Sequence, residues 1–127
     1  MPRISRRHNV WEGPLAFAVI CLDRPDTKAL RDRTRLAHME YINKHRTKMV
    51  VGGALLDDGG GTRVGMILAV DLPDRKAVEE FLADEPYNRA GIFECVVIRK
   101  FHKVFPEDDP KIFDGLIAAE RVRVGSL

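Results

Sequence analysis

The order of apolar runs and helical segments constrains the fold of this chain more than any other feature of its sequence. Residues 27–46 lack glycine and proline, and residues 73–82 open with Pro-Asp, so both segments are predicted to be helices. Their candidate N-caps are Asp26, Thr27 and Asp74. Mainly apolar runs typical of buried strands span residues 15–22, 49–56, 64–70 and 92–101. The order βαββαβ predicts an α+β, ferredoxin-like fold.

A glycine-rich run separates the two middle strands. Residues 57–61 read Asp-Asp-Gly-Gly-Gly, which is typical of the loop of an antiparallel hairpin. A phosphate-binding loop would need a helix N-terminus and a lysine after its glycines, whereas a strand is predicted here. Gly52 and Gly53, inside the preceding strand, permit a bulge or the close approach of another group.

Two helices can cover only one face of the predicted sheet. Successive side chains of a strand point to opposite faces, so Cys95 and Val97 lie on one face of the last strand and Val96 and Ile98 on the other. An apolar sheet face that no helix covers needs another partner. The sequence therefore predicts that copies of the chain pack sheet on sheet, as a homodimer or a higher oligomer.

The composition excludes several classes of function. Twenty-one Lys and Arg stand against nineteen Asp and Glu, and a net charge of +2 does not indicate a nucleic-acid partner. No run approaches the ~18 apolar residues of a membrane span. Cys21 and Cys95 each lie in an apolar run, where we expect them to be buried, and they lack metal-site spacing. These features predict a cytoplasmic protein with no nucleic-acid or membrane partner.

Both ends of the chain differ from its middle. Residues 1–14 are basic and predict a flexible leader, because no apolar run of signal-peptide length follows. Residues 106–127 predict a C-terminal extension with a helix that begins at Pro110 behind the cap Asp109. We expect it to bury Ile112, Phe113 and Leu116 against the domain or its partner; a disordered tail is the alternative. The domain itself is predicted to span residues 15–105.

The first helix carries an apolar stripe that is predicted to pack on the sheet. Its members recur at steps of seven and four residues and are Leu30, Ala37 and Tyr41. Charged residues that fall mostly on other faces are Arg31, Arg35 and Lys44. His38 lies about 80° from the centre of the stripe, so we expect it half buried at the stripe's edge. A histidine so placed suits a general acid or base; a packing role is the alternative.

A second histidine follows on a similar side of the same helix. His45 lies seven residues beyond His38, which is about 10 Å along a helix. That separation is too long for both to bind one metal ion without a third residue between them, and Ile42 occupies the intervening turn. No metal site is predicted.

Particular segments resemble a known family. They are the helical histidine in Arg35-Leu36-Ala37-His38, the pair Gly52-Gly53, the run Ala-Asp-Glu-Pro-Tyr-Asn-Arg-Ala-Gly at 83–91, and Phe-His-Lys-Val-Phe at 101–105. Together they resemble the YCII-related (YciI-like) family over roughly residues 15–105. The resemblance implies a dimeric α/β barrel built from two ferredoxin-like sheets, with a small cleft near the histidine and the acidic segment. It also implies similarity to lyases, among them dehydrochlorinases of hydroxylated aromatics that use a histidine and an aspartate.

The resemblance implies a set of site residues. His38 would be catalytic together with Asp84 or Glu85. The family usually has Asp directly before the Pro, whereas this chain has Glu85 there and Asp84 one position earlier, so the partner of His38 stays open. Tyr87 could donate a hydrogen bond to a substrate oxygen. The predicted ligand-binding residues are Tyr87, Gly53 and Gly91.

Two classes of function follow from these residues. The first is a lyase or isomerase that needs no cofactor, in which a His-carboxylate pair moves a proton on a small cyclic or aromatic metabolite. The second is a noncatalytic module that binds a small ligand or accompanies an enzyme. A monooxygenase without a cofactor is a weaker third reading, because it rests on analogy of fold alone.

Overall fold

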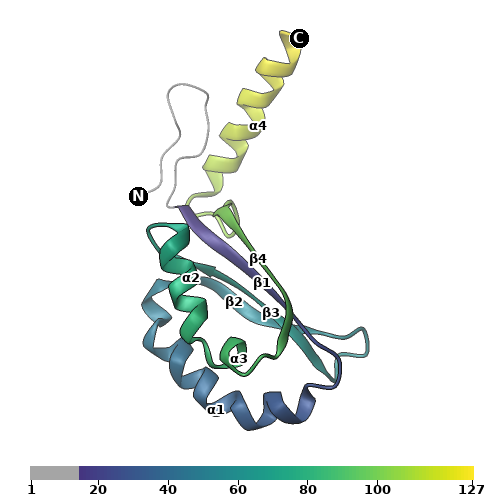
Figure 1. The fold of residues 1–127 in the computed structure, drawn as a ribbon. Helices are drawn as coiled ribbons and strands as arrows, with labels where there is room; N and C mark the ends of the chain where they lie inside the picture. The colour runs from purple at the N-terminus through teal and green to yellow at the C-terminus, as the bar shows by residue number, and fades with distance from the viewer. Residues whose placement is uncertain (1–14) are drawn as a thin grey trace. The chain divides into compact units, whose positions relative to one another are not determined.

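The computed structural model describes residues 15–127, and the leader predicted at residues 1–14 lies outside them. Its elements follow the predicted order, with a single helical turn before the last strand (Figure 1). They are β1 Leu15–Asp23, α1 Lys28–Lys44, the 3-10 turn η1 Arg46–Lys48, β2 Met49–Leu56, β3 Arg63–Val70, α2 Arg75–Asp84, α3 Pro86–Arg89, β4 Phe93–His102 and α4 Pro110–Gly125. The predicted α+β class is confirmed.

The described residues fall into two compact units. One spans Ala16–Phe101 and contains the sheet with α1, α2 and α3. The other contains Leu15 and His102–Leu127, with α4. Each unit is described by itself below.

The sheet has four strands in the order β2-β3-β1-β4. β3 pairs antiparallel with β2 on one side and with β1 on the other, so that Met66 stands opposite Ala54 and Cys21. The loop of the β2–β3 hairpin is the predicted glycine-rich run. Its amide groups are partly satisfied within the loop, because the Asp57 carboxylate accepts hydrogen bonds from Gly61 N at 3.2 Å and Thr62 N at 3.3 Å.

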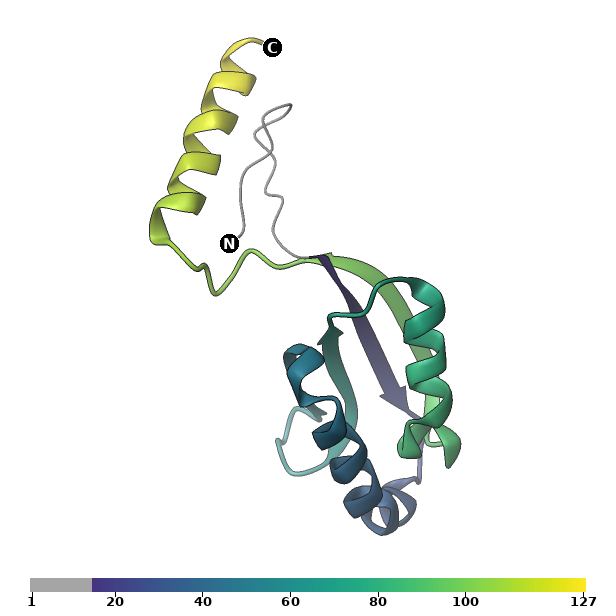
Figure 2. The same cartoon turned by 90° about the vertical axis from the view of Figure 1, so that its left-hand side faces the viewer.

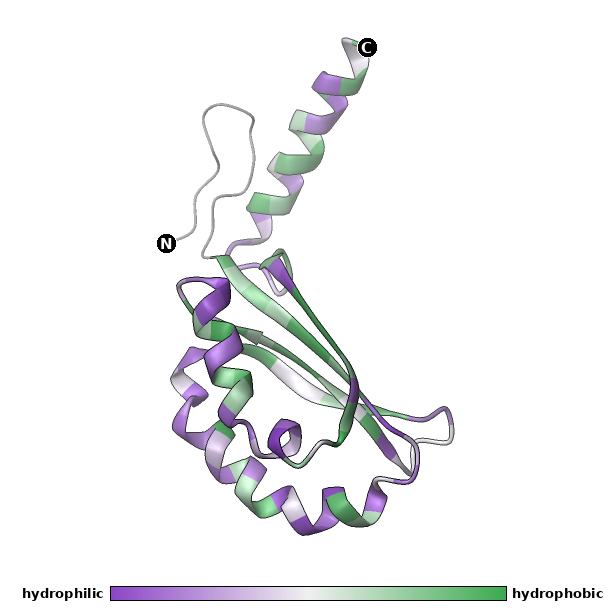
Figure 3. Cartoon of the chain, viewed as in Figure 1, coloured by the Kyte–Doolittle hydropathy of each residue, from purple (hydrophilic) through white to green (hydrophobic). Residues whose placement is uncertain are grey.

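α1 and α2 both lie in front of the strands when the molecule is turned to face them (Figure 2), so the helices cover one face of the sheet. The buried core between helices and sheet comprises Phe17, Val19, Cys21, Met66, Leu68, Val70, Val78, Phe81, Leu82 and Ile98. The Tyr41 hydroxyl ties the helices together by donating to the carbonyl oxygen of Phe81 at 2.7 Å. The strands are mainly hydrophobic along their length, whereas both helices mix hydrophilic and hydrophobic residues (Figure 3).

The inner face of α1 differs from the predicted stripe. Arg31 is buried and Ala37 is exposed, which is the reverse of the expectation. Tyr41 of the predicted stripe does pack against the core, as does Ile42. His38 and Arg31 lie about one and three turns before Ile42 on the cavity side of the helix, so the inner face is wider than the predicted stripe. The cause is a buried charge pair: Arg31 can be buried because a carboxylate meets it there.

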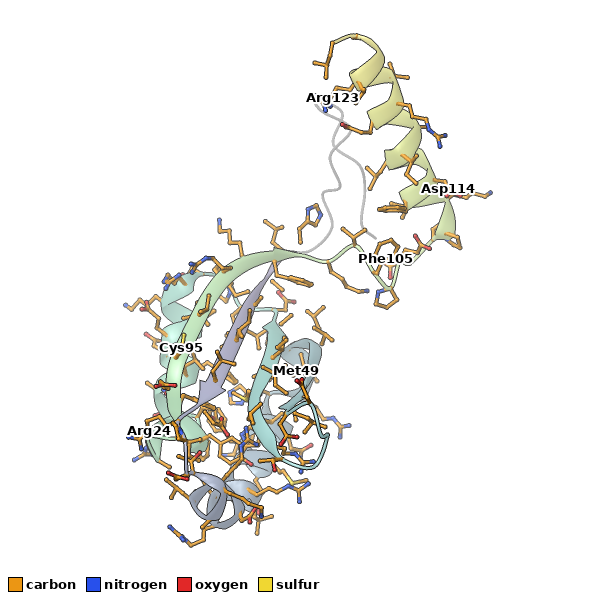
Figure 4. The ribbon with its side chains drawn as sticks, turned by 90° about the vertical axis from the view of Figure 1, so that its right-hand side faces the viewer. Arg24, Met49, Cys95, Phe105, Asp114 and Arg123 are labelled. Atoms are coloured by element: carbon orange, nitrogen blue, oxygen red, sulfur yellow. The ribbon has the colours of Figure 1, made fainter. Side chains whose placement is uncertain are left out.

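The opposite face of the sheet carries exposed apolar side chains. Leu22, Val51 and Ile67 are 44%, 51% and 38% exposed. Cys95, which is labelled on β4 in Figure 4, is also exposed, so the expectation that both cysteines are buried is wrong for this one. We call this surface the outer sheet face.

The second unit contains the predicted C-terminal helix. Asp109 caps α4 by accepting a hydrogen bond from Lys111 N at 2.9 Å, and Pro110 occupies its first turn. The rings of Phe105 and Phe113 lie 4.7 Å apart at their centroids. The helix itself has no buried residue, so the expected burial of its apolar side chains is not found within one chain.

Candidate active site

A histidine on α1 meets a carboxylate that comes from a distant part of the chain. Nδ1 of His38 contacts Oε1 of Glu85. The Glu85 side chain is fully buried, and that of His38 is 17% exposed. The second carboxylate oxygen of Glu85 accepts a hydrogen bond from Asn88 N at 3.0 Å, which caps α3. Both oxygens of this buried carboxylate are therefore hydrogen-bonded.

The two candidate carboxylates differ in the backbone that carries them. A residue before proline is pushed out of the helical conformation, and Glu85 has φ −68° and ψ 123° between α2 and α3. Asp84 is still the last residue of α2 and is exposed. Among residues 15–127 the Asp84 side chain makes no hydrogen bond or ion pair. The question left open by the sequence is answered in favour of Glu85.

Tyr87 lies next to the pair. It occupies α3 two residues after Glu85, is 2% exposed, and its ring stacks on the His38 ring with centroids 3.9 Å apart and planes 12° from parallel. The Arg31 guanidinium carbon lies 4.4 Å from the same ring centroid. Burial raises the pKa of Tyr87, and the charges of Arg31 and Arg35 oppose the rise. The hydroxyl group therefore stays protonated at neutral pH and can donate a hydrogen bond.

A buried ion pair fixes Arg31. Its Nε donates to Oδ2 of Asp23 at 2.8 Å, and both side chains are more than nine-tenths buried, at 7% and 6% exposed. Its Nη2 donates to the carbonyl oxygen of Gly65 at 3.2 Å. A Cβ at Gly65 would lie 2.1 Å from the carbonyl oxygen of Cys21, so only glycine fits at this crossing of β3 and β1. The backbone contact and the Asp23 pair together hold Arg31 in place.

A cavity of about 390 Å³ opens beside His38 and Tyr87, between α1 and the strands β2 and β3. Gly53 lines it, whereas Gly91 does not. Gly91 instead forms a turn with φ +75°, close to Arg24. The remaining lining residues are Arg31, Arg35, Met39, Ile42, Met49, Gly52, Ala54, Arg63, Met66 and Leu68.

Sequence reasoning missed the arginines and methionines of this cavity. Arg31, Arg35 and His38 are spaced four and three residues apart on α1, which is the spacing of one helix face. That spacing was a signal, but the charge of the two arginines favoured an assignment to solvent. Arg63 begins β3 after the glycine-rich loop and carries no comparable signal.

The Cys21 thiol near the site stays protonated at neutral pH. Burial, and next the charge of Glu85, raises the pKa of the Cys21 thiol to about 12.

Within residues 15–127, no three or more His, Cys, Asp or Glu side chains are grouped to hold a metal ion. In the same part of the chain, no helix is both long and apolar enough to cross a membrane.

The arrangement can move a proton. A carboxylate that contacts Nδ1 of an imidazole favours the tautomer with the proton on that nitrogen, and it stabilises the imidazolium that forms when the ring takes up a second proton. Nε2 then carries the free electron pair and is the nitrogen left for a ligand, on a side chain that lines the cavity. This geometry suits general acid–base chemistry on a small molecule.

These features define a class: a small α+β protein with a histidine and a buried carboxylate beside a cavity between one helix and a sheet. The chain belongs to the YCII-related domain family, which matches residues 15–102. The resemblance stated from the sequence is thereby confirmed.

One solved structure is similar over most of the domain. It is 5-chloro-2-hydroxyhydroquinone dehydrochlorinase (TftG) from Burkholderia phenoliruptrix AC1100 in complex with 2,5-dihydroxybenzoquinone. The two chains are 26% identical with a TM-score of 0.68, and the match covers 73% of this chain and 99% of that one.

Two further structures have lower scores. An antibiotic biosynthesis monooxygenase is 15% identical with a TM-score of 0.44 and covers 71% of this chain and 98% of that chain. Rv0793 from Mycobacterium tuberculosis is 18% identical with a TM-score of 0.42 and covers 77% of this chain and 99% of that chain. These values are too low to transfer an activity. No curated protein sequence matches the chain.

Proposed function

We propose that this protein is a lyase or isomerase that needs no cofactor and uses His38 and Glu85 to move a proton on a small cyclic or aromatic compound. The observation that carries the proposal is the contact between His38 Nδ1 and the fully buried Glu85 carboxylate at the wall of a cavity. A buried carboxylate is costly unless it is hydrogen-bonded, and here one of its two partners is the histidine. The similarity to a dehydrochlorinase at 26% identity supports the same class of reaction.

Each residue has a role in this proposal. Nε2 of His38 removes a proton from a hydroxyl or an acidic C–H of the substrate, and Glu85 stabilises the imidazolium that results. Tyr87 keeps the imidazole plane in place by stacking and can donate its hydroxyl proton to a substrate oxygen. On a chlorinated hydroxyhydroquinone, His38 would take a hydroxyl proton and return it to the ring carbon that carries chlorine, and chloride would then leave as a second hydroxyl loses its proton, so that the net change is loss of HCl.

We further propose that the domain, residues 15–105, is ferredoxin-like and works as a homodimer. The strand order β2-β3-β1-β4 with two crossover helices supports the first point. The exposed apolar side chains of the outer sheet face support the second, because a second copy of that face would cover them. Residues 106–127 are proposed to be an extension whose amphipathic helix packs on the domain or its partner.

A cytoplasmic location also stays a proposal. Cys21 and Cys95 are both free thiols, which suits a reducing compartment.

Chloride release from a chlorinated hydroxyhydroquinone tests the catalytic proposal. We expect wild-type protein to release chloride, and His38→Asn, which keeps a hydrogen-bond donor toward Glu85, to be slower by about 10²–10⁴-fold. The matched control is Asp84→Asn, which removes the neighbouring exposed carboxylate and should keep the wild-type rate.

Two results would count against catalysis. If wild-type protein binds such compounds but turns over none of them, the noncatalytic ligand-binding module is the better description. If His38→Asn turns over as fast as wild type, His38 is not the base.

A further inference from the structure

Two arginines at the cavity have no acidic partner among the described residues 15–127. Arg35 lies on α1 one turn before His38, Arg63 begins β3, and both are exposed and line the cavity. Within residues 15–127 neither guanidinium group makes an ion pair or a hydrogen bond. Arg31, by contrast, is held by Asp23 and by a backbone carbonyl.

The lining is therefore positively charged. Its residues as described include three arginines and no acid. Asp23 offsets the charge of Arg31, and the Glu85 carboxylate is engaged by His38 and Asn88. The charges of Arg35 and Arg63 remain for a ligand. Guanidinium groups bind carboxylates and other planar oxyanions through paired hydrogen bonds.

Methionines form a large part of the apolar lining of the cavity. Besides Met1, which lies outside the described residues, the chain has three methionines, and all three line this cavity: Met39, Met49 and Met66. Thioether groups make favourable contacts with aromatic rings and adapt to irregular shapes. A flat ring would lie against them, close to the stacked rings of His38 and Tyr87.

We infer that the ligand of this cavity is a planar ring compound that is an anion at neutral pH, with its ionised oxygen atoms held by Arg35 and Arg63 and its ring against the methionines. The inference rests on the proposed function, because it takes the cavity beside His38 as the active site. It adds the charge of the substrate and the residues that select for it. The ionised group can be a carboxylate on the ring or an acidic ring hydroxyl.

Calorimetric titration of the full chain tests this inference with a matched pair of ligands. The pair is 2,5-dihydroxybenzoate and its neutral amide, 2,5-dihydroxybenzamide, which have the same ring and nearly the same size. We expect the anion to bind more tightly by about 10–100-fold, which is the effect of a hydrogen bond to a charged group. Arg35→Gln and Arg63→Gln should each remove much of that difference while leaving the amide nearly unchanged.

Arg33→Gln is the control, because Arg33 is an exposed arginine of the same helix that does not line the cavity. It should leave the affinity for the anion within about 2-fold, since distant exposed charges are screened by salt. A second anion, deprotonated 2,5-dihydroxybenzoquinone, shows which ionised group the arginines bind. If only the quinone binds in an arginine-dependent way, the group is an ionised ring hydroxyl. If only the benzoate does so, the group is a carboxylate. Three results would overturn the inference. They are equal affinities for the anion and the amide, a loss of affinity for the anion in Arg33→Gln equal to that in Arg35→Gln, and no binding of either anion.

The failure of this inference can be told apart from the failure of the proposed function. If anions bind through the arginines but His38→Asn does not alter turnover, the anion site stands and the catalytic proposal falls. If neutral and anionic substrates turn over equally in a His38-dependent reaction, the catalytic proposal stands and the anion site falls.

Discussion

Replacing Glu85 by glutamine removes one negative charge from a fully buried position and hardly changes its shape. Glu85 has two hydrogen-bond partners, Nδ1 of His38 and the amide of Asn88 at 3.0 Å. If the glutamine oxygen keeps Asn88 N, its NH2 group faces His38, so Nδ1–H loses its acceptor unless the imidazole changes to the other tautomer. A buried donor left without an acceptor costs about 1–3 kcal/mol of unfolding free energy, which for a domain of this size lowers the melting temperature by roughly 4–12 °C.

The loss of charge has two further consequences. The imidazolium of His38 loses its stabilising partner, so we expect turnover to fall by about 10²-fold or more. The charge of Glu85 is one of the causes that raise the pKa of Cys21 to about 12, so Glu85→Gln should lower that pKa. The thiol resonances in NMR spectra recorded against pH report it. Asp84→Asn is the matched control and should change neither quantity.

The result that would refute this reasoning is a Glu85→Gln variant with wild-type turnover and an unchanged Cys21 titration. Loss of stability alone would not distinguish a catalytic carboxylate from a structural one. The Cys21 pKa therefore reports whether the Glu85 carboxylate is charged in the folded protein. Turnover reports whether the reaction depends on that charge.

Two more predictions concern the cysteines and the outer sheet face. Folding raises the Cys21 pKa from 9.0 to about 12, so between these pH values the folded chain holds a proton that the unfolded chain releases. The unfolding free energy should therefore fall as the pH rises through this range. In Cys21→Ala it should fall by less. A slope that is equal in both proteins would contradict burial of a protonated thiol. Ile67→Lys, at the centre of the outer sheet face, should convert the proposed dimer to a 14.4 kDa monomer in light scattering and speed alkylation of Cys95. An unchanged mass and alkylation rate would move the interface elsewhere.

Much of the fold could be predicted because local signals agree with one another. The glycine and proline positions that separate apolar runs predict every strand and the two crossover helices. The exposed Cys95 was missed because an apolar run on a strand does not say whether a second layer covers each face. That depends on another layer or another copy of the chain.

The site was predicted only in part, because it depends on contacts between residues that are far apart in the sequence. Periodicity favoured Ala37 over Arg31 as an inner residue of α1, because hydrophobic patterns do not register an ion pair such as that of Arg31 with Asp23. The edge position predicted for His38 implied that its loss would hardly alter stability. Its contact with buried Glu85 reverses that expectation, since His38→Ala would leave the carboxylate without one of its partners.

The choice between Asp84 and Glu85 shows what one sequence can and cannot supply. The conformation before Pro86 follows from local sterics and is readable from the sequence. The direction in which each carboxylate then points depends on where α1 lies, and α1 is more than forty residues away.

The nitrogen resonances of His38 test the central claim most directly. In ¹⁵N NMR of the full chain, at a pH where the imidazole is neutral, we predict that the proton sits on Nδ1 beside Glu85 and that Nε2 is unprotonated. Addition of 2,5-dihydroxybenzoate should shift Nε2 strongly, because a bound ligand would meet that nitrogen. A proton on Nε2 in the free protein, or an Nε2 resonance that a bound ligand leaves unchanged, would contradict the claim that His38 and Glu85 form the proton-transferring pair of this cavity.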